Sequence, residues 1–169
     1  MNQNDFLKLI SPFKDKLFRL SKRLLVSTEE AEDATQEVVL KLWNNRENLD
    51  TYKSLEAFSL TITKNYCLDQ LKAKRSGNLK LVHDNYFDRE PSLESQLEVK
   101  DDLIWVKKAI NELPEQQKII VQLRDIEEYE FEEIAKVMNM NETAIRVALS
   151  RARKTIRAFM LKTNDYGIK

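Results

Sequence analysis

The chain has 169 residues, and its 28 basic side chains are balanced by 28 acidic ones. With only two glycines and three prolines, the composition favours long helices over a turn-rich β fold, so we expect an all-α protein. A single cysteine excludes an internal disulfide framework, and one histidine is too little for a metal site, so no cofactor is expected. No apolar run reaches the ~18 residues that span a bilayer, and the N-terminus lacks the pattern of a secretory signal. These features indicate a cytoplasmic protein without direct membrane contact.

The first half of the chain predicts three or four helices. The first covers residues 5–26, with Pro12 inside it as a candidate bend. The second begins at Ser27, which has capping-box spacing to Glu30, and ends near residue 45. A polar loop over residues 46–54 precedes a third helix, which we expect to end near residue 75.

An acidic segment then divides the chain. Residues 76–99 carry five acidic and two basic side chains, together with one glycine, one proline and only weak periodicity. Such a composition is typical of a linker. We therefore predict two small helical domains, residues 1–75 and 98–169, joined by a flexible linker over 76–97. The single histidine, His83, lies in this linker, and we expect it to be solvated.

The second domain is also expected to hold three or four helices. Ser95 and Glu98 have capping-box spacing and predict the start of a helix that ends near residue 112. Pro114 opens the next helix, at a position where its missing N–H costs nothing, and that helix ends near Asp125. The remaining elements are a short helix over residues 130–138, a turn over 139–141 and a long helix from Glu142.

This long terminal helix is amphipathic, and its outer face is basic. Residues 143–162 hold six basic side chains and no acidic one. At about 100° per residue, seven apolar side chains fall on one side of the helix. The pattern predicts one face on a core and the other toward an anionic partner. The apolar positions are Ile145, Ala148, Leu149, Ala152, Ile156, Phe159 and Met160; the basic ones are Arg146, Arg151, Arg153, Lys154, Arg157 and Lys162.

A short helix, a three-residue turn and a long basic helix form the sequence pattern of a DNA-binding helix-turn-helix. Asn139 tolerates the left-handed conformation that the turn needs, and Asn141 can cap the helix that follows. Ala135 is small enough to let the two helices approach closely. The alternative is an ordinary amphipathic terminal helix with a solvated basic face.

An acidic stretch immediately precedes this motif. Residues 125–133 contain six acids and no base. Such a stretch would repel phosphate. We therefore expect it to face away from DNA or toward a protein partner.

In combination, these motifs resemble those of the extracytoplasmic-function (ECF) sigma factors, small bacterial RNA polymerase initiation factors of the sigma-70 family. The resemblance covers nearly the whole chain, and it rests on the order and spacing of the motifs rather than on any single one. A departure is Phe58–Ser59, where the family usually has Trp-Leu, and we expect it to change packing. The motifs are Ala31–Glu32–Asp33–Ala34, Gln36–Glu37, Leu40, Trp43, Ala57–Phe58, Ile62, Asn65 and Asp69 in the first domain, and Ala109–Ile110, Leu113–Pro114, Glu133–Ile134–Ala135, Ile145–Arg146 and Arg151–Ala152–Arg153 in the second.

The resemblance implies that the chain binds core RNA polymerase, recognises the −10 and −35 promoter elements and promotes DNA melting. The implied partners are the β and β′ subunits of the polymerase, promoter DNA and an anti-sigma factor. An enzyme is not expected, because the sequence has no Gly-rich phosphate loop and no nucleophile–His pair. The alternative function is a free-standing helix-turn-helix regulator, whose first domain would show a ligand pocket or a dimer face.

The resemblance also assigns candidate residues to three surfaces. The polymerase-binding candidates are Asp33, Gln36, Glu37, Leu40 and Trp43, and the first three share a helix face suited to arginine partners. The −10 candidates, for base and phosphate contacts, are Asn48, Tyr52, Lys64, Asn65, Asp69, Lys72, Lys74 and Arg75. The −35 candidates are Thr143, Arg146, Val147, Ser150, Arg151, Arg153, Lys154 and Arg157.

Several of these residues also have structural alternatives. Trp43 has the alternative of a core position, and Tyr52 that of closing its loop. Asn65 has the alternative of a hydrogen bond within the domain. Cys67 is expected to pack in a core rather than to act as a redox switch.

Overall fold

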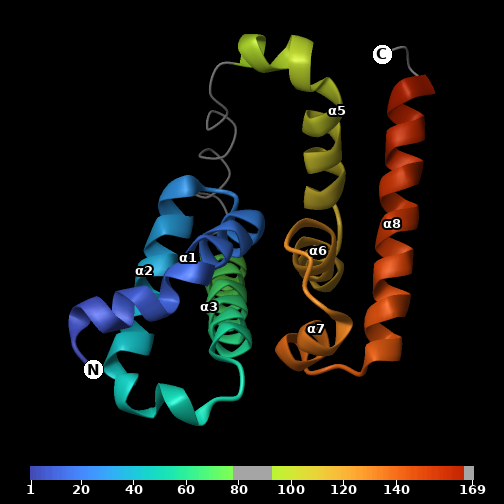
Figure 1. Cartoon of the computed structure of the whole chain (residues 1–169). Coiled ribbons are helices and arrows are strands. Elements are labelled where there is room, and N and C mark those ends of the chain that lie inside the picture. Colours follow the sequence, from blue (N-terminus) through green and yellow to red (C-terminus); the bar gives the residue numbers. More distant parts are fainter. Residues whose placement is uncertain (78–92, 166–169) are drawn as a thin grey trace.

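The computed structural model describes residues 1–77 and 93–165, with side chains described for residues 1–77 and 102–163. Every described element is a helix, which confirms the all-α prediction (Figure 1). The helices form two groups that lie side by side, one from each half of the chain. The predicted linker over 76–97 lies largely outside the described residues, as does His83, and the exact domain limits stay a prediction. No described helix is long and apolar enough to cross a membrane.

The first domain consists of α1 (Gln3–Leu25), α2 (Thr28–Asn44), the short 3-10 helix η1 (Arg46–Thr51) and α3 (Leu55–Gly77). Ser27 caps α2, as its spacing predicts, because its hydroxyl accepts a hydrogen bond from the Glu30 amide at 3.2 Å. Ser54 caps α3 in the same way, accepting from the Ala57 amide at 3.0 Å. Polar side chains next to the helices therefore satisfy an otherwise unpaired amide at each start.

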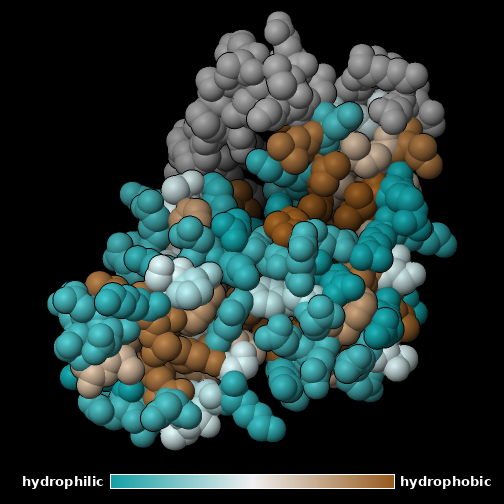
Figure 2. All heavy atoms as spheres, in the orientation of Figure 1, coloured by the Kyte–Doolittle hydropathy of each residue, from teal (hydrophilic) through white to brown (hydrophobic). Residues whose placement is uncertain are grey.

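Apolar side chains at helical spacing hold these three helices together. Burying each large aliphatic side chain contributes about 1.5–3 kcal/mol. Ser59, where the family usually has Leu, is also buried, and its hydroxyl donates to the Leu55 carbonyl at 2.8 Å. Apolar surface remains uncovered over α1 and α2. Figure 2 also shows apolar surface among polar side chains on the visible face of the first domain. The main buried residues are Phe6, Ile10, Phe13, Leu17, Leu20 and Leu24 on α1, Ala34, Val38 and Leu42 on α2, and Ala57, Leu60 and Cys67 on α3.

The second domain consists of α5 (Leu93–Asn111), α6 (Glu115–Val121), the π-helical turn η4 (Gln122–Ile126), α7 (Phe131–Met138) and α8 (Glu142–Asp165). The helices α5 and α6 both pack on α8, and α7 packs against the start of α8 (Figure 1). The core between them is aliphatic and holds Ile110, Ile119, Ile120, Leu123, Ile134, Val137, Ile145 and Leu149.

The turn between α7 and α8 has the geometry that its sequence predicts. Asn139 is left-handed, with φ 55° and ψ 48°. The Asn141 side chain caps α8 by accepting from the Ala144 amide at 2.7 Å. The Met140 amide donates to the carbonyl of Ala135 at 3.0 Å, which closes the end of α7. The predicted helix-turn-helix is therefore present.

Two local predictions are wrong. The segment 46–54 is not simply a loop, because η1 forms within it; Leu49 is buried there, and the Asn48 amide bonds to Asn45 one 3-10 turn earlier at 3.0 Å. Ser95 does not precede its helix, because α5 already begins at Leu93. In α1, the helix continues through Pro12.

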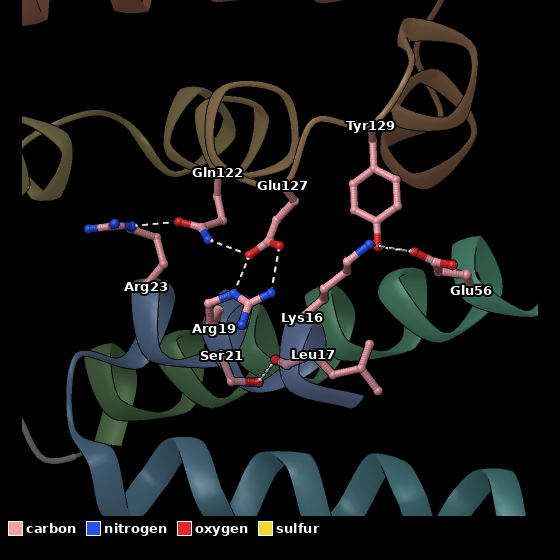
Figure 3. A network of polar contacts seen from close by, with 9 residues as sticks. All are labelled: Lys16, Leu17, Arg19, Ser21, Arg23, Glu56, Gln122, Glu127 and Tyr129. Atoms are coloured by element: carbon pink, nitrogen blue, oxygen red, sulfur yellow. Dashed lines mark hydrogen bonds and ion pairs between the residues drawn. The ribbon is translucent and has the colours of Figure 1, made fainter. Parts of the chain in front are cut away.

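Polar side chains form one part of the contact between the two domains (Figure 3), and a continuous apolar cluster forms another. Arg19 of α1 donates two hydrogen bonds to Glu127, at 2.7 and 2.8 Å, and the Glu127 side chain is only 3% exposed. The Gln122 side chain donates to Glu127 at 3.1 Å and accepts from Arg23 at 2.9 Å. The acidic stretch, which we expected to face away from DNA or toward a protein partner, thus contacts the first domain of its own chain.

A second group of interdomain contacts surrounds Tyr129, which lies just before α7. Its hydroxyl donates to the Glu56 carboxylate of α3, and Lys16 lies 3.4 Å from the same carboxylate and 4.9 Å from the centre of the tyrosine ring. Burial and the hydrogen bond to Glu56 raise the pKa of Tyr129 well above its ordinary value. Arg75 adds a third contact by donating to Glu115 at 2.9 Å.

Candidate nucleic-acid and polymerase interfaces

The helix α8 presents the basic face that its sequence predicts. Its apolar positions Ile145, Ala148, Leu149 and Ala152 are buried in the second domain. This burial fixes the rotation of the helix and turns the polar positions outward. All −35 candidates are exposed: Thr143, Arg146, Val147, Ser150, Arg151, Arg153, Lys154 and Arg157.

Arg146, one turn into α8, is held by two neighbours. Its guanidinium carbon lies 4.0 Å from the centre of the Phe131 ring on α7. One of its nitrogens lies 3.6 Å from the Glu142 carboxylate. The side chain is nevertheless 59% exposed. Arg146 is therefore oriented by the protein but still faces solvent.

Arg153, another −35 candidate, is hydrogen-bonded to an acid within the second domain. Its guanidinium donates two hydrogen bonds to Asp125 of η4, one of them at 3.1 Å. These bonds raise the pKa of the guanidinium. Arg153 and Arg157 also border a groove of about 580 Å³ whose apolar wall includes Ile156. Arg153 therefore connects η4 to α8 in this structure.

Candidate −10 residues on α3 occupy one exposed face. Asn65, Asp69 and Lys72 are all exposed and lie at helical spacing. Lys64 beside them is half-buried, and desolvation lowers its pKa. Arg75 also belongs to this set, although it contacts Glu115 of the other domain.

Lys74 and the η1 candidates lie apart from that face. Lys74 pairs with Glu30 at the start of α2, within the first domain. Asn48 is exposed, and its side-chain amide donates to Asn45 at 2.9 Å. Tyr52 precedes the start of α3 and stacks on Phe58, with ring centres 3.8 Å apart. The structure therefore gathers part of the −10 set along α3 and places the rest at its two ends.

The exposed apolar surface on α1 and α2 forms a groove of about 800 Å³. Leu40 is 51% exposed in this groove, and Trp43 closes it with an edge-to-face contact to Phe6, at 5.1 Å between ring centres. Gln36 also lines it, together with Glu32, an acid that belongs to a matched motif but is not among the polymerase-binding candidates. Three of the five polymerase-binding candidates thus share one groove.

Asp33 and Glu37 are exposed but do not line that groove. They lie toward α3, near the hydroxyl of Tyr66. Desolvation, followed by the charge of Glu37 and then more weakly by Asp33, raises the pKa of Tyr66. Lys41 lies 5.3 Å from the centre of the same ring. The five candidates on α2 therefore cover two adjacent surfaces rather than one.

The comparisons with known proteins agree with this arrangement. A family model described as Sigma-70 region 2 matches residues 9–77, and a model described as Sigma-70, region 4 matches residues 103–156. The chain belongs to the sigma-70 family. It is similar to the ECF RNA polymerase sigma factor SigW of Bacillus subtilis, with 21% identity over 92% of this chain and 89% of SigW. Because both domains match regions of one family, a sigma factor is favoured over a free-standing regulator.

Two solved structures share the fold of this sigma-70 family member. The sigma factor RpoE from Bartonella quintana, crystallised with the anti-sigma factor NepR, has a TM-score of 0.71 and 22% identity, covering 92% of this chain and 96% of that one. CnrH, in complex with the cytosolic domain of CnrY, has a TM-score of 0.67 and 18% identity, covering 94% and 89%. The two-domain helical fold is therefore common to all three chains.

Proposed function

We propose that this chain is an ECF sigma factor that binds core RNA polymerase and directs it to promoters by recognising their −10 and −35 elements. The observation that supports this most directly is the pair of matched sigma-70 regions, each with its own exposed candidate surface. The chain supplies recognition and melting rather than catalysis. It works in the cytoplasm, where its polymerase and DNA partners are found.

The polymerase interface in this proposal is α2 with the adjacent groove on α1. Leu40 and Trp43 offer the kind of partly exposed apolar anchor that dominates protein interfaces. Asp33 and Glu37, beside the groove, can pair with basic side chains on the polymerase β′ subunit. An apolar part of the polymerase would then pack in the groove, and the acidic face of α2 would orient the sigma factor on the polymerase.

The promoter interfaces are α3 for the −10 element and α8 for the −35 element. Asn65 and Asp69 would contact a base on the melted strand, with Lys72 and Arg75 near phosphates. On α8, the exposed residues that would enter the major groove beside Arg146 are Thr143, Val147, Ser150 and Arg151, with Lys154 and Arg157 near phosphates.

Binding the −10 and −35 promoter elements at the same time requires the two domains to separate. The elements lie about 25 base pairs apart, roughly 85 Å along B-form DNA at ~3.4 Å per base pair. A compact chain of this length has a radius of gyration of about 15 Å. In the closed arrangement Arg75, a −10 candidate, also bonds to Glu115 of the second domain. The closed chain therefore represents the free protein, and promoter binding opens it.

We further propose an anti-sigma factor as a partner. The solved structures of RpoE and CnrH, whose fold this chain shares, each contain a partner protein, and the partner of RpoE is named as an anti-sigma factor. Such a partner would compete with core polymerase for the α1–α2 groove.

The test mixes the chain with purified core polymerase and measures promoter-dependent transcription. Leu40→Asp should weaken core binding by tenfold or more without unfolding, because Leu40 is half-exposed. Leu9→Asp is the matched control, since Leu9 is similarly exposed on α1 but lies outside the groove. Arg146→Ala should weaken −35 promoter use and spare core binding, while Asp33→Arg should weaken core binding. Failure of the unmodified chain to bind core polymerase would overturn the proposal.

A further inference from the structure

Three planar side chains from three elements meet at the start of the helix-turn-helix. The ring of Phe131, the first residue of α7, has the guanidinium carbon of Arg146 at 4.0 Å and that of Arg124 at 4.2 Å. Arg124 belongs to η4, so the ring connects η4, α7 and α8. None of the motifs that carried the sequence prediction includes Phe131 or Arg124.

The Arg124 end of this cluster is anchored to the backbone. Arg124 donates a hydrogen bond to the carbonyl of Tyr129 at 2.9 Å, and Glu130 lies 3.8 Å away. Its side chain is 30% exposed. Arg146 at the other end is 59% exposed and has Glu142, at 3.6 Å, as an ionic neighbour. The Arg124 guanidinium is therefore held by its neighbours, whereas the Arg146 guanidinium rests on the Phe131 ring and reaches the solvent.

Stacking leaves the hydrogen-bonding capacity of Arg146 intact. The N–H donors of a guanidinium lie in its plane, whereas the contact to an aromatic ring uses its face. An arginine in a recognition helix can thus rest on a ring and still offer two donors to the O6 and N7 atoms of guanine. Stacking also restricts the side chain before DNA arrives, so that less rotamer freedom is lost on binding.

We propose that Phe131, supported by Arg124, is a positioning residue that aims Arg146 at one base pair of the upstream promoter element and so sets the base preference there. The inference rests on the proposed function, because it takes α8 as the recognition helix. Phe131 itself touches no base in this account. It acts through Arg146.

The experiment uses holoenzyme assembled from the full chain and core RNA polymerase. A pool of promoter duplexes with a randomised upstream element is selected by the unmodified chain, and the enriched sequence becomes the binding probe. Single-base variants of this probe then give the base preference at each position. The variants Arg146→Ala, Phe131→Leu and Phe131→Tyr are compared, together with the Arg146→Ala, Phe131→Leu double variant.

The proposal expects one position of the element to respond to both residues. Arg146→Ala should reduce the preference at that position by about tenfold or more. Phe131→Leu keeps an apolar side chain but removes the ring, and it should reduce the same preference about threefold to tenfold. Phe131→Tyr should restore it, and the double variant should behave like Arg146→Ala alone. Should Phe131→Leu fail to fold, Arg124→Lys, which keeps the charge but removes the planar support, should shift the same position.

Other outcomes distinguish a failure of the positioning role of Phe131 from a failure of α8 as the recognition helix. If Arg146→Ala relaxes one position while Phe131→Leu weakens all sequences equally, or still weakens binding in the double variant, Phe131 has only a structural role and the inference is wrong. If the unmodified holoenzyme enriches no upstream sequence, or Arg146→Ala changes no preference, the proposed recognition helix fails and the positioning role fails with it.

Discussion

Contacts within the domains differ in kind from contacts between them. Each domain core is filled by aliphatic side chains, such as Leu60 in the first domain and Ile134 in the second. Between the domains the apolar cluster continues, but polar groups take part as well, with Glu127 paired to Arg19 and Tyr129 bonded to Glu56. Exposing aliphatic side chains to water is unfavourable, whereas charged and polar groups regain hydration when they separate. The difference indicates two stable domains that are able to come apart.

The largest effect is expected in the cores. Leu60→Ala leaves a cavity at a fully buried position and should lower the free energy of unfolding by about 2–5 kcal/mol. Urea unfolding followed by circular dichroism measures this loss. A loss below about 1 kcal/mol would show that the core of the first domain is less tightly packed than its burial indicates. Leu161→Ala, at a residue 65% exposed on α8, is the control and should change little.

The next effect is expected at the interface. Arg19→Ala removes two hydrogen bonds from the Glu127 carboxylate, whose side chain is only 3% exposed. Because the Arg19 side chain is 47% exposed, water screens this pair, and the cost is smaller than for a fully buried ion pair. The chain avoids this cost by opening, because Glu127 then regains water. Small-angle X-ray scattering should show a larger radius of gyration, with helix content unchanged by circular dichroism.

Lys8→Ala provides the control for that experiment, since Lys8 is exposed on the same helix and lies outside the network. Its radius of gyration should equal that of the unmodified chain. If Arg19→Ala also stays compact, or if it unfolds the first domain, the interface is part of a single core and the comparison is wrong.

A smaller effect is expected from Tyr129→Phe. The substitution removes the hydrogen bond to Glu56 and keeps the ring beside Lys16. One such bond contributes about 0.5–1.5 kcal/mol, so the ratio of closed to open chain should fall about twofold to tenfold. Energy transfer between labels on the two domains measures this ratio, and Tyr66→Phe, within the first domain, should leave it unchanged.

The smallest effect is expected for the alkylation rate of Cys67, which distinguishes separation of the domains from loosening of the first domain's core. Burial raises the pKa of its thiol to about 11, so that about 0.1% is thiolate at pH 8, and alkylation of the folded chain should be very slow. Because the thiol lies in the core of the first domain, opening the interface by Arg19→Ala should not speed this reaction. Fast alkylation in that variant, measured by mass spectrometry, would mean that domain separation also loosens the core.

Local features were the ones that sequence could predict. The left-handed Asn139 and the cap by Asn141 depend on residues within a few positions of each other, and so does the cap by Ser27. The apolar stripe of α8 follows from helical periodicity alone. These features need no knowledge of distant neighbours.

Pairings across the chain could not be predicted in the same way. The partner of Glu127 is Arg19, 108 residues away, whereas the pattern of acids predicted only that the stretch faces away from DNA or toward a protein partner. Spacing placed Asp33 and Glu37 on one face of α2, but the position of the groove depends on how α1 lies against that helix. Phe131 could have been suspected as an aromatic residue beside a basic helix, yet its contact with Arg146 depends on the turn geometry.

The central claim is that a closed, two-domain sigma factor opens when it engages polymerase and promoter. Fluorescent labels on Gln70→Cys of α3 and Ala158→Cys of α8, both exposed and outside the candidate sets, report the distance between the domains. The account predicts efficient energy transfer in the free chain. It predicts little transfer in the holoenzyme on promoter DNA, where the two elements lie roughly 85 Å apart. The same efficient transfer in the free chain and in an active promoter complex would contradict it.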